Sequence, residues 1–189
     1  MKINDYKNSI NRDKIHFGFT LVEMLVTLSI IVIMSSILIV YSRNGEKVGQ
    51  LNRATERLSF DVRRMASMSM QTKQFKDSSG NLHDVCGWGI YFGDPGSNSY
   101  IIFSDFCETG QDKGNLMFER EETQETITFG KSVKIADSTI KSLVYVPPEP
   151  KLYLISQGSL QIDRGEIVLS GVGNNKTIEI TNSGNFIIR

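Results

Sequence analysis

FTLVEMLVTLSIIVIMSSILIVY, residues 19–41, is the most apolar stretch of the chain, and Glu23 is its only charged residue. A helix of this length spans roughly 34 Å, about the thickness of the hydrocarbon core of a bilayer. We therefore expect residues 19–42 to form a single transmembrane helix. The flank before it is richer in positive charge than the flank after it, which favours a cytoplasmic N-terminus and an exported C-terminal domain. The basic residues of the first flank are Lys2, Lys7, Arg12 and Lys14.

A small residue, Gly18, stands directly before the apolar stretch. An ordinary secretory signal has a shorter apolar core with its small-residue cleavage site after that core. Cleavage after Gly18 would instead remove residues 1–18, a charged leader, and leave the hydrophobic helix on the mature protein. The alternative is a helix that is never cut and serves as a permanent anchor.

Glu23 is costly at its position, because a carboxylate in a membrane helix costs roughly 2.5–3.5 kcal/mol near the bilayer centre and less near its edge. Such a residue usually has a partner. Cleavage after Gly18 would create one, a free amine on Phe19, four residues before Glu23. The two groups can pair within one helix or between neighbouring helices, and in the second case the carboxylate sets the register of an assembly.

The segment HFGFTLVE, residues 16–23, followed by the apolar run, resembles the class III signal of type IV pilins and type II secretion pseudopilins. This resemblance implies that a prepilin peptidase cuts between Gly18 and Phe19 and methylates the new N-terminus. It also implies that Glu23, the fifth residue of the mature chain, acts in assembly with other pilin or pseudopilin subunits. The expected location is the inner membrane, with the C-terminal domain outside the cytoplasm, and then a pilus or pseudopilus.

Residues 43–75 are expected to form an amphipathic helix that continues the membrane segment. Many major pilins have a proline near the end of the membrane segment, where this chain has Val40 and Ser42 instead. Gly45 and Gly49 follow, and we expect the helix to loosen at these glycines. The arginines at 53, 57, 63 and 64 lie mostly off the apolar stripe and are interpreted as a solvated face. Apolar residues recur at a spacing of three or four at Leu51, Ala54, Leu58, Val62 and Met65.

Residues 76–189 show short strand patterns separated by glycine, asparagine and aspartate, which predicts a β-rich globular domain. The expected fold class is α+β, in which the long N-terminal helix packs its stripe on an antiparallel meander. Hairpin turns are expected at Asn174–Asn175 and Asn182–Asn185. The segment 86–105 also resembles the first hairpin of the minor pilins and H-type pseudopilins. Strands are expected near 87–93, 99–106, 115–119, 126–129, 132–136, 140–146, 152–156, 160–163, 166–170, 176–181 and 185–188.

The two cysteines, Cys86 and Cys107, suffice for one disulfide if the domain folds in an oxidising compartment. A hairpin whose loop is 95–98, closed by Asp94 opposite Ser99, places the cysteines directly opposite each other. Directly opposed residues are close to disulfide spacing, and a local adjustment would complete the fit. Buried free thiols are the alternative. The same register predicts the pairs Phe92 with Ile101, Ile90 with Phe103 and Trp88 with Asp105.

No residue pattern predicts catalysis, a cofactor or a metal site, and we do not expect an enzyme. His83 is interpreted as a solvated loop residue, because no nucleophile motif accompanies it. The acidic segment 105–112 has carboxylates that could bind calcium, but it lacks the ligand spacing of an EF-hand, and a solvated loop is favoured.

The charge balance bears on possible partners. Lysine and arginine number 21, as do aspartate and glutamate, which argues against a nucleic-acid binder. The favoured function is a structural pilin or pseudopilin subunit. A competence pseudopilin that captures DNA and an uncleaved, membrane-anchored adhesin are the alternatives. The basic residues that keep DNA capture open are Lys131, Lys134, Lys141, Lys176 and Arg189.

Overall fold

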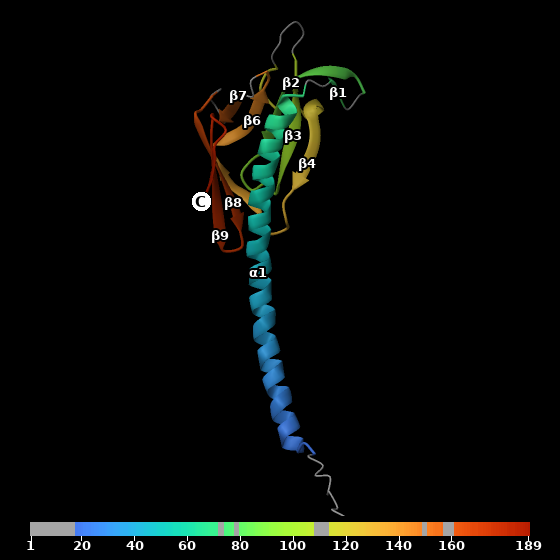
Figure 1. Ribbon diagram of the computed structural model, residues 1–189, viewed down its shortest axis with the longest axis vertical. Coiled ribbons are helices and arrows are strands. Elements are labelled where there is room, and N and C mark those ends of the chain that lie inside the picture. The colour runs from blue at the N-terminus through green and yellow to red at the C-terminus, as the bar shows by residue number, and fades with distance from the viewer. Residues whose placement is uncertain (1–17, 72–73, 78–79, 108–113, 149–150, 157–160) are drawn as a thin grey trace, which may run out of the picture. The chain divides into compact units, whose positions relative to one another are not determined.

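The computed structural model describes residues 18–71, 74–77, 80–107, 114–148, 151–156 and 161–189 (Figure 1). The expected leader, apart from Gly18, lies outside the described residues. The chain divides into two units, one that ends at Ser42 and one that comprises Arg43–Arg189. Helix α1, Leu21–Ser69, contributes to both units.

The part of α1 that belongs to the first unit is apolar. Residues Leu21–Ile39 have a mean hydropathy of 2.4, and none of this stretch is buried in the structure. Its length and composition are sufficient to cross a membrane. The hydroxyls of Thr27, Ser29 and Ser36 donate to carbonyl oxygens of the same helix at 2.9, 2.8 and 2.8 Å. These internal hydrogen bonds leave no hydroxyl of the three without a partner in an apolar solvent.

In the second unit, α1 buries the predicted apolar stripe, which confirms the amphipathic pattern. Leu58, Val62 and Met65 are completely buried, and burial of each such side chain contributes about 1.5–3 kcal/mol. The helix continues through Gly45 and Gly49, so the expected loosening at these glycines is wrong.

The helix ends at Ser69, before the predicted boundary at residue 75. Residues Gln74–Lys76 form strand β1, which pairs with β2. The ring of Phe75 packs edge-on against Trp88, with ring centroids 5.0 Å apart. This aromatic contact favours the strand at a place where the helical pattern of the sequence fades.

The first sheet is antiparallel with the strand order β4-β3-β2-β6-β7, and β1 pairs with β2 outside this order. The β2 strand lies between β3 and β6, so the sheet is not the simple meander that we expected. A short 3-10 helix, η1 (Arg120–Glu122), precedes β4. The remaining strands are β2 (Leu82–Tyr91), β3 (Ser99–Phe106), β4 (Thr123–Thr128), β6 (Ile140–Val146) and β7 (Lys151–Ser156).

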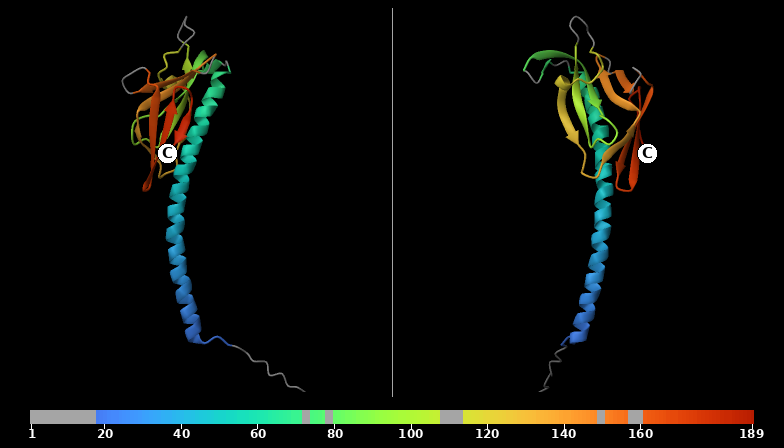
Figure 2. Two further views of the ribbon diagram at one scale, coloured as in Figure 1. Left: turned by 60° about the vertical axis from the view of Figure 1, so that its left-hand side comes forward. Right: turned by 180° about the vertical axis from the view of Figure 1, so that it is seen from behind.

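The second sheet is also antiparallel, with the order β10-β9-β8-β5. In β8, buried Gly165, Ile167 and Leu169 alternate with less buried residues, which is the period of a strand with one face in the core. A single hydrophobic cluster contains the α1 stripe and residues of both sheets, and α1 lies alongside them in Figures 1 and 2. The strands are β5 (Lys134–Ser138), β8 (Arg164–Gly171), β9 (Asn174–Thr181) and β10 (Phe186–Ile188).

Several strand predictions agree with the structure, among them 99–106 and 140–146. The predicted strand at 115–119 is wrong, because this segment is irregular and leads into η1. The predicted turn at Asn174–Asn175 is wrong by two residues. The β8–β9 turn is Val172–Gly173, where Gly173 has a φ of 83° that favours glycine.

The predicted register of β2 and β3 is wrong by one residue. Ile90 pairs with Ile102 rather than with Phe103, and a slip of one residue moves side chains to the other face of a sheet. A register shift between Val85 and Gly87 marks a bulge, which the predicted hairpin did not include. The pairs that the structure contradicts are Phe92 with Ile101, Ile90 with Phe103 and Trp88 with Asp105.

Phe103 occupies the face of the first sheet opposite α1, where Phe118 and Tyr91 join it. Phe118 stacks on Tyr91 at 4.6 Å and meets Phe103 at 5.5 Å between ring centroids. Gly89 provides the space for this arrangement, since a Cβ atom there would lie 2.5 Å from two ring carbons of Phe103 and 2.6 Å from the carbonyl oxygen of Leu143. The absent side chain at position 89 is therefore a packing requirement.

We predict that Gly89→Ala destabilises the domain by about 1–3 kcal/mol, because the added methyl group overpacks this face. Urea unfolding of the full chain in detergent, followed by Trp88 fluorescence, measures the effect. Gly45→Ala is the matched control, because nothing lies within 4 Å of a Cβ at that helical position. Equal midpoints for the Gly89 variant and the unmodified chain would contradict the packing argument.

Candidate processing and assembly site

The start of α1 is fixed by Thr20, which stands directly before the helix. Its side-chain oxygen accepts a hydrogen bond from the backbone N–H of Glu23 at 3.2 Å, and its carbonyl accepts one from Met24 at 3.1 Å. Thr20 therefore acts as the N-cap of the helix, with Glu23 at the third helical position. This role of Thr20 was not predicted, although a threonine three residues before a glutamate is a recognised signal of a helix N-terminus.

The bond between Gly18 and Phe19 lies just outside the capped helix. Gly18, Phe19 and Thr20 are all exposed, and the exposed fraction of Phe19 is 74%. Nothing lies within 4 Å of a Cβ built at Gly18. A protease needs backbone that is free of helical hydrogen bonds, and this bond meets that requirement.

Glu23 lies in the first turn of α1 and is exposed among apolar neighbours. The positive end of the helix dipole favours a carboxylate at this position. No described residue forms an ion pair with Glu23. A cationic partner would therefore come from the new N-terminus or from another molecule.

Residues 14–39 match the family model described as the prokaryotic N-terminal methylation motif. The chain carries a prepilin signal. This match confirms the resemblance to type IV pilins and pseudopilins at the N-terminus and indicates a structural subunit rather than an enzyme family. It covers the cap, Glu23 and the apolar stretch, and it does not distinguish between branches. No curated protein and no solved structure matches the chain.

Cys86 and Cys107 form a disulfide, which confirms the pairing expected for a domain that folds in an oxidising compartment. Their Cα atoms are 4.9 Å apart. The geometry differs from the predicted one, because Cys86 lies at the bulge of β2 and Cys107 follows the end of β3, where its N–H donates to the carbonyl of Asp84 at 2.9 Å. The loop between them has 20 residues, for which the chain-entropy account gives a contribution of about 3 kcal/mol.

The acidic segment 105–112 extends beyond the described residues, since 108–113 are outside them. Asp105 is completely buried, and both of its carboxylate oxygens lie 3.3 Å from the backbone nitrogen of Leu116, which donates to them. Asp105 therefore helps to hold the segment that carries Phe118. Within the described part of the chain, no group of three or more His, Cys, Asp or Glu side chains is arranged to hold a metal ion.

His83 lies in strand β2, so the interpretation of His83 as a solvated loop residue is wrong. Its Nε2 atom is 3.1 Å from Asp77, and its ring stacks on Phe106 with centroids 4.6 Å apart. These contacts join the β1–β2 hairpin to the end of β3. The structure gives His83 a packing role.

Asp61 lies beside the arginines that were interpreted as a solvated face, but it is buried between α1 and the first sheet. Its carboxylate accepts a hydrogen bond of 2.5 Å from the hydroxyl of Tyr100. Arg57 and Arg64 flank it at 3.7 and 3.9 Å and also reach Glu125 on β4. Burial, reinforced by this hydrogen bond, raises the pKa of Tyr100 above its ordinary value. The cluster attaches α1 to the sheet.

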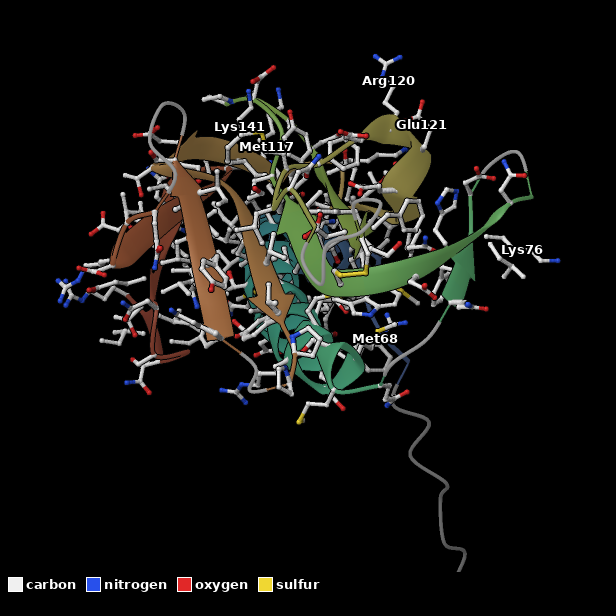
Figure 3. The ribbon with its side chains drawn as sticks, turned by 90° about the horizontal axis from the view of Figure 1, so that it is seen from above. Met68, Lys76, Met117, Arg120, Glu121 and Lys141 are labelled. Atoms are coloured by element: carbon white, nitrogen blue, oxygen red, sulfur yellow. A yellow bond between two sulfur atoms is a disulfide. The ribbon has the colours of Figure 1, made fainter. Side chains whose placement is uncertain are left out.

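Glu122 is a second buried carboxyl group, and its burial was not predicted from the sequence. It accepts hydrogen bonds from the backbone N–H groups of Phe106 at 2.8 Å and Glu119 at 3.0 Å. Burial raises the pKa of Glu122 to about 7, and the nearby charges of Glu119 and Glu121 act in the same direction. The neighbouring Arg120 and Glu121 are exposed, and Arg120 points away from the domain in Figure 3.

We predict that stability decreases as the pH rises from about 4.5 to about 7, because the folded protein holds the Glu122 proton more tightly than the unfolded chain. The contribution is fully present below pH 4.5 and amounts to about 3 kcal/mol. Urea unfolding of Glu122→Gln across this range should show a flatter profile than the unmodified chain.

Glu121→Gln is the control for this prediction, because Glu121 is an exposed neighbour on the same 3-10 helix. Its profile should follow that of the unmodified chain. Identical pH profiles for all three proteins would show that Glu122 does not titrate in this range.

Proposed function

We propose that this protein is a structural subunit, a minor pilin or pseudopilin, of a type IV pilus or a type II secretion pseudopilus. A prepilin peptidase cuts it after Gly18 and methylates Phe19. Before assembly the subunit is anchored in the inner membrane by residues 19–42, with the C-terminal domain outside the cytoplasm. The observation that carries the proposal is the prepilin signal at residues 14–39, placed on an exposed, capped helix start.

The geometry of α1 supports assembly through this helix. The stretch Leu21–Ile39 is apolar and without cover in the structure, so it requires either lipid or neighbouring helices around it. Glu23 has no described partner and would gain one from the Phe19 amine of its own or a neighbouring subunit. The disulfide of Cys86 and Cys107 agrees with a domain that folds outside the cytoplasm.

We predict that the protein recovered from its native membrane begins at Phe19 and carries a methyl group on that amine. Terminal sequencing and mass spectrometry of the membrane extract measure both features. An intact chain that still carries residues 1–18 would support the uncleaved adhesin and contradict the proposal.

We predict that Glu23→Gln leaves cleavage unchanged but reduces the filament fraction sheared from cells by at least tenfold. The reason is that the neutral amide cannot balance the amine of a neighbouring subunit in an apolar environment. The filament fraction is measured by immunoblot against the membrane-bound pool.

Glu46→Gln is the matched control, because Glu46 is an exposed acidic residue of the same helix beyond the apolar stretch. It should assemble as the unmodified chain does. Equal filament yields for Glu23→Gln and Glu46→Gln would remove Glu23 from the assembly mechanism.

A further inference from the structure

One end of the second unit is formed where α1 enters it. Ser132, in the loop before β5, donates a hydrogen bond to the side chain of Gln50 at 2.6 Å. Gly171, at the end of β8, lies against Leu51, which a Cβ at position 171 would approach to 3.3 Å. The loop 129–133 and the β8–β9 turn therefore lie beside the first turns that α1 contributes to this unit.

Four lysines gather at this end, which we call the basic end: Lys47, Lys131, Lys134 and Lys176. Lys47 and Lys131 line one shallow hollow with Gln50, and Lys134 lines another with Val172. Lys176 pairs with Leu169 beside the β8–β9 turn. None of the four forms an ion pair with another described residue.

The lysines outnumber the acidic residues near them, Glu46 in the first hollow and Asp94 in the adjoining β2–β3 loop. An apolar residue, Val172, stands at the tip of the β8–β9 turn with an exposed fraction of 54%. Lysines around an exposed apolar tip are the composition of a surface that binds the interface of an anionic membrane.

Chain connectivity keeps Lys47, one of the four lysines of the basic end, near the bilayer. Lys47 follows Ile39, the last residue of the candidate span, by eight residues, or about 12 Å of helix. The headgroup layer occupies about 5–7 Å of that distance, and the Debye length at physiological salt is about 8 Å. Lys47 is therefore within electrostatic reach of headgroup phosphates, and the other three lysines belong to the same end of the second unit.

We propose that the basic end rests on the headgroups of anionic phospholipids while the subunit is anchored in the membrane, before it enters a filament. This inference rests on the proposed membrane anchoring. A second copy fits the surface less well, because copies anchored in one bilayer present their basic ends at the same height. The acidic residues Asp77, Asp84, Glu119, Glu121 and Glu122 lie at the opposite end of the β2–β3 pair.

The test uses the full chain reconstituted in vesicles of phosphatidylcholine alone or with added phosphatidylglycerol. The rate of acetylation of each lysine is measured by mass spectrometry. An interaction of about 1 kcal/mol per lysine corresponds to acetylation about fivefold slower at Lys131 and Lys134 in the anionic vesicles. Lys76 and Lys151 lie away from the basic end and serve as internal controls, and 1 M salt should remove the difference.

Two matched double variants, each with two lysines reversed in charge, test the same inference independently. Lys131→Glu with Lys134→Glu should abolish the protection of Lys47 and Lys176 in anionic vesicles. Lys76→Glu with Lys151→Glu, which reverses two exposed lysines elsewhere, should leave that protection unchanged.

Equal acetylation rates in the two kinds of vesicle would overturn the inference. Protection that depends on the protein-to-lipid ratio rather than on phosphatidylglycerol would assign the surface to a second copy, and equal protection by soluble glycerophosphate would assign it to free phosphate. Carbonate extraction separates this inference from the proposed function. A chain that is released from the vesicles overturns both, whereas a retained chain without protection overturns this inference alone.

Discussion

The apolar stripe of α1 is the interaction on which the second unit depends. The two sheets form separate hydrogen-bonded ladders, and both pack on the core that they share with Leu51, Leu58, Val62 and Met65. Without this stripe, each sheet would expose an apolar face to water. The pair of Asp61 and Tyr100 adds direction to the contact, because a buried carboxylate is stable only where its hydrogen bond is formed. The helix is thereby held at one rotation and one height against the strands.

Helix α1 contains two stretches with different side-chain patterns, and each pattern suits a different environment. Residues 21–39 are apolar on every side, which suits lipid or a ring of neighbouring helices, whereas the later residues are apolar only on the stripe. The hydroxyls of Thr27, Ser29 and Ser36 in the first stretch donate to carbonyl oxygens of their own helix, and those of the buried Thr55 and Ser59 do the same. The backbone is continuous through Gly45 and Gly49, so the transition is made by side chains rather than by a break in the helix.

The features that could be predicted from sequence are those whose cause lies within a few residues. The stripe of α1 and the strands at 99–106 and 140–146 follow from local periodicity. The β2–β3 register could not be predicted, because it depends on a bulge beside Cys86 that no local pattern in the sequence indicates. The disulfide was expected from a register that proved wrong, and it forms because the bulge brings Cys86 to Cys107. Buried Asp61 and Glu122 were missed for a similar reason, since Tyr100 and Phe106, which donate hydrogen bonds to them, lie on a different element, strand β3.

The prepilin signal can be recognised in the sequence because its parts are contiguous. A cleavage site must be recognised in contiguous residues, so glycine, cap, carboxylate and apolar run all fall within residues 14–39. What distinguishes one subunit from another is instead distributed over the surface of the folded domain, where residues from distant strands meet. The basic end illustrates this, because its lysines come from α1, the loop before β5, β5 and β9. A short contiguous motif therefore identifies the prepilin signal. The role of the individual protein depends instead on surfaces that form only when distant parts of the chain fold together.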